Sequence, residues 1–376
     1  MIILLILIAF LVLSILVVIH EFGHFWVAKK FGVYVEEFGV GLPPRAWGKK
    51  IGETLYSLNW IPLGGFVKLH GEVGEEKVAY PNRAFVNKGA IPRILIALAG
   101  IAMNLIFAVF AFSVVYTFQG IPKLRELGHV VVTGTTENSP AQIAGFRDND
   151  IVVDVNGKKF TQSDEFIKEI ENLKGNRIRV NVERILDGEK KIVPLWVTPR
   201  SDPPAGEGPL GVAIVSKEEY FYFAPYWQRP ILGIKQGFAD AFNFSKLVGE
   251  GLITMVTQLA GGKVPQGVAG PVAIIAVTTE VTKLGFLPLL NFAGLISVNL
   301  AILNLVPFPP LDGSRVLFII LEKIFGKKKI NKVEGNIYQI GMMILLALAV
   351  ILTFKEVPKL VSAGSASKFI ESLITK

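Results

Sequence analysis

IILLILIAFLVLSILVVIHEFGH, residues 2–24, joins a long uncharged apolar run to a pair of histidines. At about 1.5 Å per residue, a helix through Ile2–Ile19 and onward past the histidines is long enough to cross a bilayer. Residues four apart share one face of a helix, so His20 and His24 can bind one cation while Glu21 projects beside them. Ionisable groups at such depth are costly and are candidates for function. The stretch therefore predicts a membrane helix that carries a metal site.

The composition also indicates a membrane protein. Apolar residues make up 51% of the 376 residues, and the sequence has no cysteine. Disulfides and thiolate ligands are therefore excluded, and a metal site has to use histidine and carboxylate side chains. The basic residues behind the net charge of +8 gather between the first two apolar segments and between the last two. This is the positive-inside pattern of cytoplasmic loops, so we expect no nucleic-acid partner.

Several apolar segments are long enough to span a bilayer. We expect membrane helices at about residues 2–28, 94–118, 286–306 and 337–354. If the basic loops are cytoplasmic, residues 120–229 lie outside, together with both ends of the chain.

The segment between the second and third spans has the pattern of a compact β-rich domain. Runs of β-branched or alternating residues are separated by Asn-Gly and Asp-Gly turns, which are strong signals for strands and hairpins. Strands are expected at residues 129–133, 150–157 and 177–197, the last range folding back at Asp187-Gly188. A helix is expected at residues 161–173, with Thr161 and Asp164 as a capping box.

A motif in this domain suggests its type. Ser139-Pro-Ala-Gln-Ile-Ala-Gly-Phe146, followed by Asp150 and Asn156-Gly157, resembles the PDZ domain. The resemblance implies a small β-barrel whose groove can bind a peptide as an added strand. A domain that acts only as a steric cap is the alternative, because no carboxylate-binding loop stands out.

Residues 203–283 read as a linker followed by an amphipathic region. A Pro- and Gly-rich stretch at 203–209 suggests a turn, and an aromatic cluster at 220–227 suits a membrane interface. Residues 231–259 mix apolar stretches with charged side chains, which predicts one or two helices on the outer membrane surface. A helix packed beneath the outer domain is the alternative.

The two histidines need a third partner, because a catalytic zinc site has three protein ligands and an open position. Asp312 ends the apolar segment Asn304–Gly313, in which prolines break the helix at membrane depth. Irregular backbone there is tolerated only within protein or beside a cavity, so Asp312 is the expected partner. The alternative is that Asp312 caps a helix beginning near Ser314. The other carboxylates considered, on the expected outer side or in a basic stretch, are Asp240, Glu250, Glu280 and Glu322.

Together these motifs suggest a family. His20-Glu21-Phe-Gly-His24 in the first span, with Asn304–Gly313 after the third, resembles the site-2 protease family of intramembrane zinc metalloproteases. The PDZ-like domain makes the chain similar to the bacterial RseP group. The resemblance implies a zinc ion held by His20, His24 and Asp312, with Glu21 as general base. It also implies that Asn304 holds the substrate backbone or the developing oxyanion.

The same resemblance implies a function and a location. A zinc metalloendopeptidase of this type hydrolyses peptide bonds within the transmembrane segments of single-span proteins, in regulated intramembrane proteolysis. Anti-sigma factors and remnant signal peptides are the implied substrates, and the lipid bilayer is the other partner. The implied location is the bacterial inner membrane, with the PDZ-like domain outside and the active site toward the cytoplasm. A proteolytically silent scaffold and a zinc-dependent carrier or sensor are the rival functions.

Two further segments resemble family features. Residues 54–61 and 64–69, joined by Pro62-Leu63, predict a hairpin or strand near the membrane, similar to the family's membrane-associated β-structure. Its free edge can pair with an unwound substrate, or the hairpin can simply shield the site. Gly100-Ile-Ala-Met-Asn104 has Ile101 where the family often has proline, which leaves Asn104 as a packing residue or an outer contact of the site.

The expected fold class is a mostly α-helical polytopic membrane protein with about four transmembrane helices, a membrane-associated β-hairpin and one inserted PDZ-like β-rich domain. The expected domains are residues 1–119 with the zinc motif and a cytoplasmic β-structured loop, 120–202 with the PDZ-like domain, 203–283 with the linker and interfacial helices, and 284–376 with the last two spans and the third metal ligand.

Overall fold

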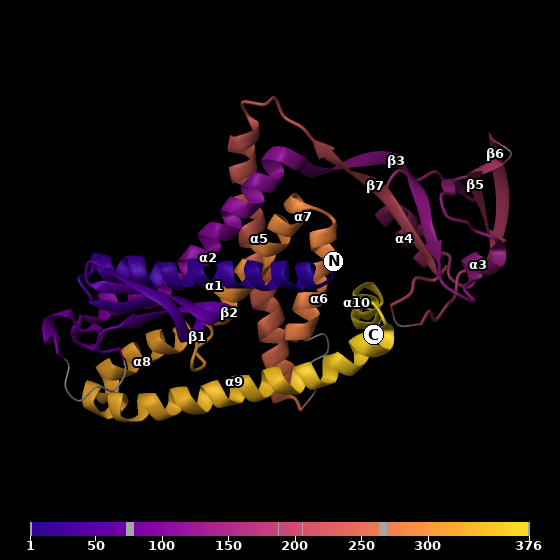
Figure 1. Cartoon of the computed structure of the whole chain (residues 1–376). Helices are drawn as coiled ribbons and strands as arrows, with labels where there is room; N and C mark the ends of the chain where they lie inside the picture. Colours follow the sequence, from indigo (N-terminus) through magenta and orange to yellow (C-terminus); the bar gives the residue numbers. More distant parts are fainter. Residues whose placement is uncertain (1, 73–78, 187, 205, 263–268, 375–376) are drawn as a thin grey trace. The chain divides into compact units, whose positions relative to one another are not determined.

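The chain folds into two compact units, seen in a computed structural model that describes residues 2–72, 79–186, 188–204, 206–262 and 269–374 (Figure 1). One unit joins Met1–Gly120 to Ala224–Lys376, and the other is Ile121–Phe223. We call the first the membrane unit and the second the β unit.

The membrane unit is mainly helical, because a chain in lipid has to satisfy its backbone polar groups internally. Among the described residues, 4 helices are long and apolar enough to cross a membrane: Leu4–Lys30, Ala90–Gln119, Phe286–Leu305 and Val333–Ala363. The helices of the unit are α1 (Ile2–Lys30), α2 (Ala90–Gln119), α5 (Arg229–Ala260), α6 (Pro271–Lys283), α7 (Phe286–Leu305), α8 (Asp312–Phe325), α9 (Lys327–Ala363) and α10 (Ala366–Ile374), with short 3-10 turns η1 (Pro81–Arg83) and η2 (Phe85–Asn87). The expected fold class, a helical membrane protein with an inserted β domain, is confirmed.

Small residues let the helices around α2 approach closely, as is common in membranes. Gly294 of α7 lies against the ring of Phe112, where an added Cβ would come within 2.6 Å of the ring. One turn further along α7, the Ser297 hydroxyl donates to the carbonyl of Asn104 at 2.9 Å. Because of these contacts, α7 packs along α2, and its contact with Asn104 lies close to the histidines of α1.

Helix α5 also packs against α2. Gly233 contacts Thr117, and Gly237 contacts Ser113 four residues earlier in α2, so the two helices run antiparallel. The sequence predicts one or two amphipathic helices here, and the structure has one whose first half packs on a span. Its position on the outer membrane surface stays a prediction.

Strands β1 (Val35–Ile51) and β2 (Thr54–Leu69) form an antiparallel sheet within the membrane unit. Phe38 of β1 has two partners, Tyr56 and Val67, so β2 folds around β1 and pairs with it on both sides. Residues 54–61 and 64–69, which the sequence predicts as a hairpin or strand, belong to the single strand β2, and both stretches pair with β1 instead of with each other. Strand β1 is not predicted from the sequence, because its glycines and prolines weaken the strand signal.

The β unit is a five-stranded antiparallel sheet in the order β6-β5-β4-β3-β7. Its strands are β3 (Ile121–Thr135), β4 (Ile151–Val155), β5 (Ile178–Leu186), β6 (Glu189–Val197) and β7 (Val212–Tyr222), and its helices are α3 (Pro140–Ala144) and α4 (Ser163–Asn172). Alternate strand residues such as Val180 and Val182 are fully buried, and α4 covers them with Phe166 and Ile170. A single apolar core therefore holds this unit.

The strands and the one helix predicted for this domain are present, with two differences. Helix α4 begins at Ser163 with Gln162 at its N-cap and no side-chain cap, so Thr161 lies too early to form the expected capping box. The unit also extends beyond the expected boundary at residue 202, because β7 pairs with β3 from Ile121 opposite Tyr222 to Thr135 opposite Val212. Asp187 of the expected hairpin turn lies outside the described residues.

Candidate active site

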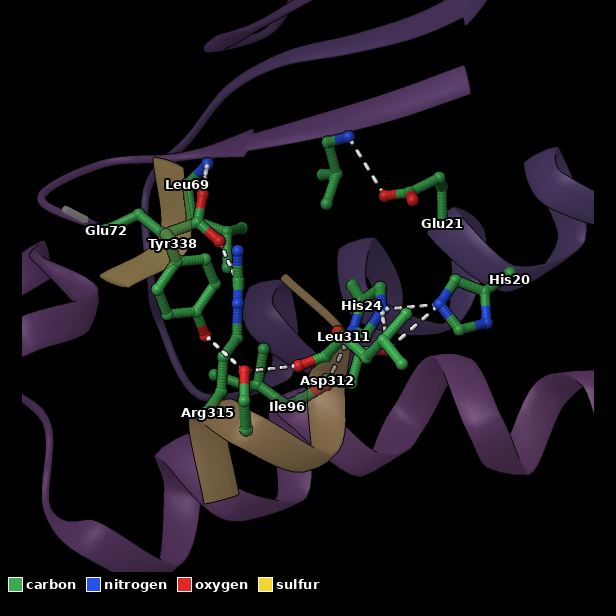
Figure 2. A network of polar contacts seen from close by, with 12 residues as sticks. His20, Glu21, His24, Leu69, Glu72, Ile96, Leu311, Asp312, Arg315 and Tyr338 are labelled. Carbon is green, nitrogen blue, oxygen red and sulfur yellow. Dashed lines mark hydrogen bonds and ion pairs between the residues drawn. The ribbon is translucent and has the colours of Figure 1, made fainter. Parts of the chain in front are cut away.

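The two histidines of α1 and the aspartate at the start of α8 meet at one point (Figure 2). The Nε2 atoms of His20 and His24 lie 3.0 Å and 3.2 Å from Oδ2 of Asp312. They are 3.2 Å from each other, as expected for side chains one helical turn apart. All three residues are buried, although they are almost 300 positions apart in the sequence.

This arrangement fits a zinc ion. Oδ2 of Asp312 is buried and makes no regular hydrogen bond among the described residues, while two imidazole nitrogens face it. Two histidines and one carboxylate are a known ligand set for catalytic zinc, which keeps a further position open for water. These three residues are also the group of possible ligands found in the described part of the chain.

Glycines allow α1 and α2 to close behind the histidines. A Cβ on Gly100 would lie 2.4 Å from Nε2 of His24 and 2.7 Å from Nε2 of His20, which no side chain tolerates. On the other helix, a Cβ on Gly23 would lie 2.3 Å from the carbonyl oxygen of Ala99. The site therefore depends on Gly100 as well as on its ligands, a role that no local sequence pattern predicts.

Each histidine is oriented by a contact on its other ring nitrogen. Nδ1 of His24 lies 2.8 Å from the carbonyl oxygen of Ile96, to which it donates, leaving Nε2 free to bind a metal. Nδ1 of His20 lies 3.2 Å from the side-chain amide of Asn104, whose Oδ1 is buried without a hydrogen bond. Exchanging the amide oxygen and nitrogen, which look alike, lets Oδ1 accept from Nδ1. Asn104, whose role the sequence left open, thus contacts a candidate ligand.

Glu21 and Asn304 line the same cavity as the candidate ligands, so all five predicted site residues surround one space. The cavity has a volume of about 250 Å³. Oε2 of Glu21 accepts a hydrogen bond of 3.1 Å from the backbone N–H of Val67 in β2. The carboxylate therefore lies between the candidate metal site and the last stretch of β2 (Figure 2).

Asp312 does not act as a helix cap. Helix α8 begins at Asp312 itself, its N-cap is Leu311, and no side chain caps it. The alternative interpretation of Asp312 as a capping residue is therefore not supported.

The other carboxylates considered lie elsewhere and have partners of their own. Glu322 of α8 makes two hydrogen bonds to Arg93 of α2, at 2.6 Å and 2.8 Å, with both side chains buried. Asp240 binds the hydroxyl of Tyr116. Glu280 and Glu250 lie near Lys283 and Lys246. Within the described residues, Asp312 is the carboxylate that reaches the histidines.

Comparison with known proteins gives the family. Residues 8–348 match the model of peptidase family M50. The chain belongs to this family, the site-2 proteases. The resemblance seen in the motifs is therefore confirmed.

Relatives that match over nearly their whole length carry names that agree with this family. A protein of Clostridium perfringens named "putative zinc metalloprotease" is 33% identical over 350 residues, covering 93% of this chain and 97% of its own. Proteins of the same name from Clostridium acetobutylicum and Nostoc are 34% and 30% identical, covering 94% of this chain and 97% and 95% of their own. This M50 protein is a zinc metalloprotease embedded in a membrane.

A solved structure is also similar to part of this chain. It is the PDZ domain of an SdrC-like protein from Listeria monocytogenes, with 20% identity and a TM-score of 0.20, covering 23% of this chain and 88% of that one.

Proposed function

We propose that this M50 protease hydrolyses peptide bonds within transmembrane segments of single-span membrane proteins. The observation that carries the proposal is the depth of the candidate metal site. His20 and His24 lie within α1, in the segment Leu4–Lys30 that is long and apolar enough to cross a membrane. A soluble substrate would have to enter the membrane to reach such a site, whereas a transmembrane segment is already at that depth.

In this proposal His20, His24 and Asp312 hold the zinc ion. A bound zinc ion lowers the pKa of a water molecule and polarises the scissile carbonyl. Glu21 takes a proton from the attacking water and passes it to the leaving amine. Asn304, which lines the cavity, donates a hydrogen bond to the oxyanion as it develops.

The substrate has to be extended before cleavage, because the carbonyls of a helix are already hydrogen-bonded within the helix. Residues Gly65–Leu69 of β2 offer an edge for this purpose, since β1 covers only one side of them. On the other side, the N–H groups of Val67 and Leu69 point at carboxylates, Glu21 at 3.1 Å and Glu72 at 3.4 Å. A substrate strand added at this edge would pass beside the metal site.

We further infer that the protein is a multi-pass protein of the bacterial inner membrane, with the active site toward the cytoplasm and the β unit outside. The basic loop after α1 and the basic start of α9 support this orientation. The β unit then either binds a peptide as a PDZ domain does or restricts access to the membrane unit. The substrate class includes anti-sigma factors and remnant signal peptides, cut after a first protease trims the outer part.

The experiment is cleavage of a single-span test protein in liposomes by wild type and by Glu21→Gln, with zinc measured in both. General acid–base catalysis contributes roughly 10²- to 10⁴-fold, so Glu21→Gln should lose that much activity and keep its zinc. If neither protein cuts a panel of single-span substrates while both hold zinc, the proposal fails and a scaffold or metal sensor is favoured.

A further inference from the structure

An ion pair at the edge of the cavity has no part in the chemistry described so far. The guanidinium of Arg315 in α8 binds Oε1 of Glu72, which follows β2 (Figure 2). Both residues line the cavity that contains the histidines and Asp312, and their side chains are 25% and 17% exposed. The pair therefore lies where a substrate near the metal site would pass.

Glu72 connects its ion pair with Arg315 to the edge of β2 that does not pair with β1. Its second oxygen, Oε2, accepts from the backbone N–H of Leu69 at 3.4 Å. The preceding N–H on the same edge, that of Val67, donates to Glu21. Alternate residues of a strand point to the same side, so these are successive outward N–H groups of one edge. One faces the candidate base and the next faces Glu72.

Arg315 joins the pair to the candidate third metal ligand. It follows Asp312 by three residues in α8, so the two side chains lie on the same face of the helix. The hydroxyl of Ser314, the residue before Arg315, donates a hydrogen bond to the carbonyl of Leu311 at 2.6 Å. It also lies 3.2 Å from the hydroxyl of Tyr338 in α9. The first turn of α8 is thus held against both α9 and β2.

We propose that Glu72 and Arg315 are a positioning pair that sets which peptide bond of the substrate faces the metal site. This rests on the proposed function, in which the substrate pairs with the edge formed by residues 65–69. Strand pairing alone allows slippage in steps of two residues, about 6.6 Å, because side chains and hydrogen bonds repeat with that period. The pair prevents slippage by holding the edge at a fixed distance from Asp312.

The test compares wild type with Glu72→Gln, Arg315→Gln and the double variant in the liposome cleavage assay. Mass spectrometry of the product ends reports which bond is cut, and zinc is measured in each protein. We expect every variant to keep its zinc, because none of the three candidate ligands is changed. The rate at the wild-type bond should fall roughly tenfold to a hundredfold, as for a misplaced substrate. New products should appear, displaced by two residues.

Two comparisons separate positioning from general loosening. The double variant should be no worse than either single variant, because residues that act as one unit are not additive. Arg315→Lys keeps a charge opposite Glu72 and should restore most of the wild-type product. The matched control is Glu322→Gln, which breaks the ion pair between α8 and Arg93 ten residues beyond Asp312 in the sequence, and should leave the cleaved bond unchanged.

The inference is overturned if the variants cut at the wild-type bond alone, whatever their rate, if they lose zinc, or if Glu322→Gln shifts the cleaved bond equally. The proposed function is judged separately, by cleavage with wild type and its loss in Glu21→Gln. No cleavage by wild type would overturn both proposals together, whereas wild-type cleavage with an unchanged bond in every variant overturns the positioning role alone.

Discussion

The β unit and the membrane unit of this protein both have buried apolar clusters, but they differ in the side chains that they expose. In the β unit the interior is apolar, as in Val180 and Val182, and exposed positions are mostly polar. In the membrane unit the buried groups at the site are polar, as in His24 and Asn104, while α9 turns large apolar side chains outward. Only 6% of the apolar window of α9 is buried inside the structure.

This difference shows that the solvent, water or lipid, decides whether the hydrophobicity of a side chain indicates that it is packed inside. In water, an apolar residue is driven inside and marks the core. In lipid, an apolar side chain is about as stable facing the lipid as packed inside the protein, so hydrophobicity does not indicate which face of a helix is packed. There the glycines and polar residues mark the packed faces, as Gly100 and His20 do.

The largest effect on folding is expected at a charged pair in the β unit. Asp150 is fully buried and binds Arg184 through two hydrogen bonds of 2.7 Å. Arg184→Met leaves that carboxylate buried without its counter-charge, although the backbone N–H of Arg147 still donates to it. The loss should lower the free energy of unfolding by about 3–5 kcal/mol. Pulse proteolysis of the full chain in urea measures the loss.

The matched control is Arg179→Met on the same strand, where the side chain is exposed. It should change the stability by less than about 0.5 kcal/mol. An equal effect of the two substitutions would show that the buried ion pair of Arg184 stabilises the fold no more than an exposed arginine does.

The second prediction places the same change in both surroundings. Leu346 in α9 and Ile192 in β6 are 58% and 64% exposed. Leu346→Lys should make insertion of α9 less favourable by about 2.5–3.5 kcal/mol, because the exposed face meets lipid. Ile192→Lys should alter the stability of the β unit by less than about 0.5 kcal/mol, because that face meets water.

A membrane-insertion reporter measures the first of these changes, and the urea midpoint of the full chain measures the second. If Leu346→Lys inserts as well as wild type, the outward face of α9 does not contact lipid.

The third prediction concerns the packed glycine behind the site. An alanine at position 100 would press against both histidines, as the distances from its Cβ show. Gly100→Ala should weaken zinc binding by about 10- to 100-fold, the usual effect of disturbing groups that orient the ligands. Competition with a chelator measures the affinity. Gly249→Ala in α5, where a Cβ meets nothing within 4 Å, is the control and should bind zinc like wild type.

The smallest effect is expected at a surface ion pair. Hydrogen bonds from Arg83 and Lys29 lower the pKa of Glu53 from 4.5 to about 2. Because the folded-state pKa is lowered, the stabilisation is present above about pH 4.5 and is lost as the pH falls toward about 2. Glu53→Gln should cost less than about 1 kcal/mol at pH 7, since the group is 34% exposed.

Thermal unfolding in detergent compares Glu53→Gln with wild type at both ends of this range. The difference between the two proteins should vanish at about pH 2. A difference that stays constant between pH 7 and pH 2 would assign the effect to packing instead of charge.

Much of this protein can be predicted from local sequence. The apolar run of α1 and the spacing of His20 and His24 depend only on the geometry of a helix. The break around Asp312 follows from its prolines, and the strands of the β unit follow from alternation and turn residues. All five predicted site residues lie around one cavity.

Other features depend on residues far apart in the chain, so local periodicity does not predict them. There are three examples: the pairing of β1 on both of its sides, the pairing of β7 with β3 in the β unit, and the contact of Asn104 with His20. Nothing near Gly100 in the sequence shows that two imidazoles will press against it.

The kind of protein and its candidate metal ligands can be predicted from the sequence, because helix period, apolar length and ligand chemistry are local properties. The groups that orient those ligands, and the edge of β2 that faces them, are known from the folded structure alone. Their orientation depends on contacts across space, such as Glu72 with Arg315, which form when the helices and strands pack together.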